Sequence, residues 1–62
     1  MTTEQCVEKM GEYGWAAEVV NGIPMIAVPQ TEYLLPKTVK KIRKDIQGIG
    51  YDRSFGVRPQ EQ

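Results

Sequence analysis

Residues 15–29, WAAEVVNGIPMIAVP, decide the fold because they predict a β-hairpin closed by Asn21 and Gly22. A two-residue type I′ turn needs a positive φ angle at both central residues, and an Asn-Gly pair tolerates this best. The turn fixes the register of the two strands, with Val20 opposite Ile23 and the remaining pairs following outward from the turn. The rest of the chain is expected to pack around this hairpin.

The predicted register gives the hairpin two different faces, because successive side chains on a strand point to opposite sides. The face expected to line the core carries no charge and consists of Trp15, Ala17, Val19, Pro24, Ile26 and Val28. The other face carries Glu18 as its only charge and consists of Ala16, Glu18, Val20, Ile23, Met25 and Ala27.

Pro24 predicts which strand lies at the edge of the sheet. In the expected register Pro24 and Val19 form a non-hydrogen-bonded pair, so the missing N–H of Pro24 points away from the first strand. Proline is tolerated where a strand has no neighbour on that side. We therefore expect the second strand to be an edge, and any third strand to pair with the first.

A short amphipathic helix is expected before the hairpin, over residues 3–13. Thr2 and Gln5 have the spacing of a capping box, with Thr3 as the alternative cap, and Gly14 is suited to stop the helix. Its apolar stripe consists of Cys6, Val7, Met10 and Tyr13. For Cys6 this spacing predicts a small buried side chain.

A longer helix is expected after the hairpin, over residues 32–47, with an irregular start that becomes regular at Pro36. Gly48 is expected to be its C-cap, and Gly50 adds a further turn position. Its apolar stripe is expected to pack on the sheet and consists of Leu35, Val39, Ile42, Ile46 and Ile49.

Residues 51–59, YDRSFGVRP, predict a turn and then a short strand that Pro59 ends. A right-handed crossover through the long helix would make this strand parallel to the second one. Because Pro24 marks an edge, we expect it beside the first strand and antiparallel to it. The predicted fold is a single α+β domain over residues 1–62: helix-strand-strand-helix-strand, a three-stranded antiparallel sheet of order 2-1-3, both helices on one face, and a frayed tail at residues 60–62.

The composition argues against several functions. Eight basic and eight acidic residues give a net charge of zero, which argues against strong non-specific attraction to nucleic acid or acidic membranes. One cysteine and no histidine provide neither a zinc site nor an activated nucleophile. Asp45 and Asp52 are interpreted as ordinary surface charges. We therefore expect no catalytic residues, no metal and no cofactor.

The chain also gives an expectation for the compartment. No apolar run has the length of a membrane span, and the N-terminal sequence MTTEQ has no basic and apolar leader. The lone Cys6 cannot form an internal disulfide. These features predict a cytoplasmic protein with no membrane partner.

A basic segment lies within the second helix. Five of the eight basic residues fall here: Lys37, Lys40, Lys41, Arg43 and Lys44. Such a helix can contact phosphates, which makes a nucleic-acid accessory protein the alternative function. The same residues also suit a solvated helix face, and no aromatic residue is interleaved with them to stack on bases. The solvated face is the favoured interpretation.

The outward face of the hairpin provides the main functional hypothesis. If both helices cover the face of Trp15, the opposite face exposes a contiguous apolar patch that consists of Val20, Ile23, Met25 and Ala27. Such patches usually mark a partner or a ligand. We therefore expect a non-enzymatic protein-interaction domain, either a homodimer or a partner of another protein. The alternatives are that the patch is too small to matter or that the first helix covers it.

Overall fold

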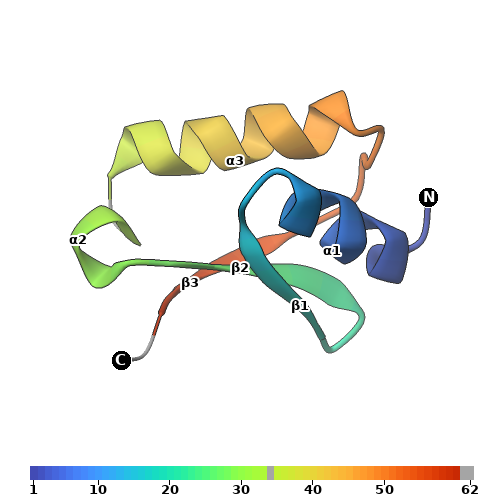
Figure 1. The fold of residues 1–62 in the computed structure, drawn as a ribbon, viewed down its shortest axis with the longest axis horizontal. Coiled ribbons are helices and arrows are strands. Elements are labelled where there is room, and N and C mark those ends of the chain that lie inside the picture. Colours follow the sequence, from blue (N-terminus) through green and yellow to red (C-terminus); the bar gives the residue numbers. More distant parts are fainter. Residues whose placement is uncertain (34, 61–62) are drawn as a thin grey trace.

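The computed structural model describes residues 1–33 and 35–60, and Figure 1 shows the longer helices on one side of a small twisted sheet. In chain order the elements are α1 (Thr3–Glu12), β1 (Ala16–Val20), β2 (Ile23–Val28), α2 (Gln30–Tyr33), α3 (Pro36–Gly48) and β3 (Gly56–Pro59). The protein is a small α+β domain built on a mixed sheet.

The hairpin forms as predicted. Asn21 and Gly22 have φ angles of 52° and 80°, the positive values that the turn requires. The strands β1 and β2 pair antiparallel in the expected register, from Ala16 opposite Ala27 to Val20 opposite Ile23. The local turn sequence therefore determines the pairing of all five residues of β1.

The predicted sheet order and the purely antiparallel sheet are wrong. The order is β1-β2-β3, and β3 runs parallel to β2, with Met25 opposite Gly56 and Val28 opposite Pro59. Pairing with β3 starts only at Met25, so the missing N–H of Pro24 faces no strand even though β2 is central. The parallel direction of β3 relative to β2 agrees with the expected crossover.

The end of β3 is held close to β2. The N–H of Gln60 donates a hydrogen bond to the carbonyl of Val28 at 2.6 Å. Residue 60, expected to be part of a frayed tail, thus continues the pairing of β3 with β2. Residues 61–62 of that predicted tail lie outside the described part of the chain.

The capping box of α1 is confirmed. The N–H of Gln5 donates to the Thr2 hydroxyl at 3.1 Å, and the N–H of Thr2 donates to the Gln5 side chain at 2.9 Å. The hydroxyl of Thr3 also donates to the carbonyl of Gly22 at 2.9 Å, which ties the start of α1 to the hairpin turn. Gly14 follows the helix with a φ of +94° and provides the expected stop.

The expected second helix is divided into α2 and α3. Leu35 precedes Pro36 and is extended, with φ −76° and ψ 125°, because a residue before proline is disfavoured in the helical region. Pro36 begins α3, as predicted. Gly48 is the last residue of α3 and not its cap, and Gly50 supplies the left-handed conformation that turns the chain, with φ +96°.

The core lies between the helices and one face of the sheet. Its buried apolar side chains come from α1, β2, α3 and the segment after α3, and they are Cys6, Met10, Ile26, Val28, Ile42, Ile46 and Tyr51. Both α1 and α3 contribute to this one face, as predicted (Figure 1). Val19 belongs to the same face but is 41% exposed, because β1 is an edge strand.

Candidate interaction surfaces

The sheet face opposite the helices is the first candidate surface. Burial alternates along β2, so that Ile23, Met25 and Ala27 are half-buried while the residues between them are buried. Val20 on β1 is also half-buried. We call this surface the open face, and it contains all four apolar residues that the sequence predicts to be there. In the described part of the chain, both longer helices pack on the other side of the sheet.

Met25 makes the open face continuous from β2 to β3. A Cβ atom added to Gly56 would lie 2.7 Å from the Met25 sulfur and 2.8 Å from its terminal carbon. The same Cβ would lie 3.7 Å from Cδ1 of Ile23. The Met25 side chain therefore lies across β3 at a position where a glycine leaves room for it, with Ile23 beside it.

An ion pair crosses the open face. Arg58 on β3 pairs with Glu18 on β1, so the two side chains span the central strand. Their side chains are 49% and 53% exposed, and an ion pair this exposed contributes at most about 1 kcal/mol. The pair borders an open hollow of about 420 Å³ that Ala16, Met25 and Ala27 also line. The open face is thus apolar near the turn and charged toward the other end.

The free edge of β1 is a second candidate surface. Val20 and Ile23 form the hydrogen-bonded pair next to the turn, so the backbone groups of Ala17 and Val19 point away from β2. The N–H of Trp15 points to the same side and donates to the carbonyl of Met10 at 3.0 Å. Because Pro24 appeared to place β1 in the centre, the sequence does not predict this edge.

The basic residues of α3 do not all share one environment. All five are exposed: Lys37, Lys40, Lys41, Arg43 and Lys44. Helical periodicity places Lys37, Lys40 and Lys44 on the side away from the buried Ile42. Arg43 instead lines a hollow beside β3. The segment is therefore a solvated helix face with one arginine turned toward another part of the molecule.

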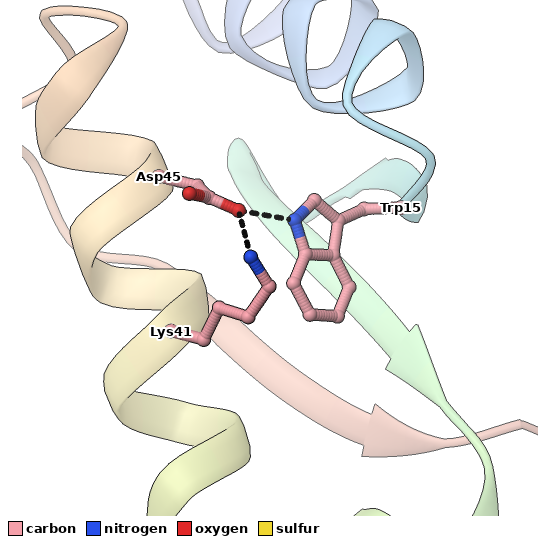
Figure 2. A network of polar contacts seen from close by, with 3 residues as sticks. All are labelled: Trp15, Lys41 and Asp45. Carbon is pink, nitrogen blue, oxygen red and sulfur yellow. Dashed lines mark hydrogen bonds and ion pairs between the residues drawn. The ribbon is translucent and has the colours of Figure 1, made fainter.

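Asp45 has a structural role that the sequence does not reveal. Its Oδ2 accepts a hydrogen bond from the Trp15 indole N–H at 2.8 Å, and the Lys41 ammonium lies 3.8 Å from the same oxygen (Figure 2). The Asp45 side chain is only 15% exposed, so its interpretation as an ordinary surface charge is wrong. A half-buried tryptophan usually finds an acceptor for its N–H. This contact joins α3 to the start of β1.

Replacing Asp45 with alanine should lower the free energy of unfolding by about 1–3 kcal/mol, because it leaves the indole N–H of Trp15 without its charged acceptor. Urea denaturation followed by Trp15 fluorescence measures the loss. Asp45→Asn retains a carbonyl acceptor and should lose less. Asp52→Ala is the matched control at an exposed aspartate. Equal stability of Asp45→Ala and Asp52→Ala would contradict the role of this hydrogen bond.

The single thiol of the described chain is buried and lies outside any cluster of metal-ligating residues. Residues 1–33 and 35–60 contain no cluster of three or more histidine, cysteine or acidic side chains that could hold a metal ion. Cys6 is a free, fully buried thiol, and burial raises its pKa. Reactive cysteines have the opposite properties, a lowered pKa and partial exposure.

Two further findings concern membrane spanning and similarity to known proteins. Among the described helices, none combines the length and the apolar character needed to cross a membrane. Comparison with protein-family models, with curated proteins and with solved structures finds no match to this chain.

Proposed function

We propose that the protein is a non-enzymatic protein-interaction domain that associates with a second copy of itself through the open face. The observation that carries this proposal is the continuous half-buried apolar surface of Val20, Ile23, Met25 and Ala27 on the side of the sheet away from α1 and α3. The reducing cytoplasm is its proposed location, which suits the free thiol of Cys6.

Two properties of the open face favour a second copy as the partner. A two-fold interface joins the same patch of both molecules, so each charged residue must meet its complement. The open face carries both Glu18 and Arg58, and an antiparallel arrangement can exchange their internal ion pair for two pairs between the copies. The flexible Met25 side chain can also adapt to an identical surface.

The size of the open face limits the affinity. Five residues along a strand and three strands across span on the order of 17 by 10 Å, from a rise of about 3.3 Å and a spacing of about 4.8 Å. This is well below the roughly 800 Å² that each partner buries in a standard interface. We therefore expect a weak dimer, with a dissociation constant on the order of 10⁻⁵ to 10⁻³ M.

Replacing Ile23 and Met25 with lysine should abolish the dimer, because it places two charges in the centre of an apolar contact. Sedimentation velocity from about 20 μM to about 1 mM protein covers the expected range. The sedimentation coefficient should rise with concentration for the wild type and stay constant for the double variant. Circular dichroism and Trp15 fluorescence check that the variant remains folded.

The control adds the same two charges elsewhere. Tyr13→Lys and Leu35→Lys replace apolar side chains that are 57% and 37% exposed and lie outside the open face, so this double variant should dimerise like the wild type. A wild type that remains monomeric throughout the range would overturn the proposal.

Val19→Pro distinguishes the open face from the β1 edge. The N–H of Val19 points away from β2, so proline there blocks strand addition without removing a bond to β2. An open-face dimer should survive this change. A dimer that is lost in Val19→Pro but kept in the Ile23 and Met25 variant would place the interface at the edge of β1.

A further inference from the structure

A second hollow lies beside β3, at the edge of the sheet opposite β1. Its volume is about 670 Å³, and its lining includes Tyr33, Arg43, Asp52, Arg53 and Phe55. These residues come from α2, α3 and the segment between α3 and β3. The buried Tyr51 positions that segment, because its hydroxyl donates to the carbonyl of Ser54 at 3.3 Å.

Two arginines give this hollow a positive character. Arg43 and Arg53 both line it, and neither forms an ion pair with an acidic residue of the described chain. Within residues 1–33 and 35–60, Asp52 is the only acidic residue that lines the hollow. The guanidinium group is planar and can donate two parallel hydrogen bonds to a phosphate. The hollow therefore offers two unneutralised anion-binding groups.

Two aromatic rings accompany the arginines. Tyr33 and Phe55 are half-buried, and they pack at the rim of the core while lining the hollow. In the sequence no aromatic residue is interleaved with the basic residues of α3, but the fold places these two rings in the lining of the same hollow as Arg43. Aromatic side chains that stack on bases, next to cations that contact phosphates, are typical of sites for single-stranded nucleic acid.

The charge around the hollow is segregated from the rest of the molecule. The chain from Pro36 to Pro59 contains seven basic and two acidic residues, although the whole protein is neutral. The acidic side chains of α1 are Glu4, Glu8 and Glu12. Lys40 lies three residues before Arg43, about one turn away on α3, so it extends the positive surface outward from the hollow.

We propose that this hollow binds single-stranded nucleic acid. Phosphates contact Arg43 and Arg53, and an unstacked base packs against Tyr33 and Phe55. The volume falls in the range of about 300–1,000 Å³ that is typical of ligand sites, enough for a single nucleotide unit. Rings that can stack favour this ligand over an acidic peptide, which would use only the arginines. The site lies away from the open face and does not depend on self-association.

Fluorescence anisotropy of a labelled oligothymidine at low salt tests the proposal on the full chain. Arg43→Gln with Arg53→Gln should weaken binding at least about 10-fold and reduce the slope of log affinity against log salt by about 1.4, since each phosphate contact contributes about 0.7. Lys9→Gln with Lys37→Gln removes the same charge at exposed residues that do not line the hollow, and it should have a much smaller effect. An equal loss of affinity in the two double variants would contradict binding at this hollow.

Aromatic substitutions separate a base-binding site from a purely electrostatic one. Phe55→Leu should weaken binding about 10-fold without changing the salt slope, because stacking releases no counterions. Asp52→Asn should strengthen binding, since among the described residues it removes the one carboxylate that lines the hollow. Loss of folded protein could only weaken binding, so a gain in affinity for Asp52→Asn cannot result from destabilisation. No anisotropy change for the wild type, or equal affinity for an oligoglutamate peptide, would overturn the proposal.

Discussion

Replacing Ile42 with alanine should unfold a large fraction of the protein at room temperature. Ile42 is completely buried on α3, in the core between the helices and β2. Such a truncation costs about 2–5 kcal/mol, while a single core of this size rarely supplies more than about 3–5 kcal/mol in total. Thermal and urea denaturation followed by circular dichroism should show a transition that starts without a native baseline.

Leu35→Ala is the matched control for this prediction. The sequence places Leu35 and Ile42 on the same apolar stripe, but Leu35 is 37% exposed. Its truncation should therefore cost less than about 1 kcal/mol. Equal denaturation midpoints for the two variants would contradict the placement of Ile42 at the centre of the core.

Alkylation of Cys6 by iodoacetamide should be slower in the folded protein than in urea by a factor on the order of 10²–10³. Cys6 is completely buried, so the reagent reaches its sulfur only when α1 separates from the sheet or the chain unfolds. Burial also raises the pKa of the thiol and lowers the fraction of reactive thiolate. Mass spectrometry of quenched samples measures both rates. A folded-state rate close to that in urea would show that α1 does not cover Cys6.

The raised pKa of Cys6 also gives stability a pH dependence. The folded protein holds the thiol proton more tightly than the unfolded chain does, so this contribution is fully present below the ordinary pKa of 9.0. It is lost as the pH rises through the higher pKa of the folded state. Cys6→Ala should show a smaller decrease in stability over this alkaline range than the wild type.

Local sequence signals predict the hairpin and the start of α1 correctly. The Asn21-Gly22 turn and the capping box of Thr2 and Gln5 depend on residues within a few positions of one another. The break between α2 and α3 also has a local cause, which is Pro36, but the apolar stripe by itself does not indicate a break. The order of the strands is predicted wrongly from the sequence, because Pro24 removes only its own hydrogen-bond donor and leaves those of the rest of β2. The pairing of β2 with β3 begins one residue later, at Met25, so Pro24 does not prevent it.

The candidate surfaces depend on contacts that spacing cannot predict. Trp15 and Asp45 are 30 residues apart in the chain, and helical periodicity identifies the face of α3 but not the side chain that meets it. Arg43 and Arg53 line the same hollow because the segment after α3 turns back toward the sheet. Of the predicted sites, the open face follows directly from the hairpin register. The free edge of β1 and the hollow lined by Arg43 and Arg53 can be identified only from the tertiary structure.

Isotope-filtered nuclear Overhauser spectroscopy on a mixture of labelled and unlabelled protein, near millimolar concentration, tests the proposed dimer most directly. The proposal predicts contacts between molecules that involve the side chains of Ile23 and Met25, together with those of Val20 and Ala27. Contacts between molecules confined to the backbone of Ala17 and Val19 would contradict it, as would chemical shifts that do not change with concentration.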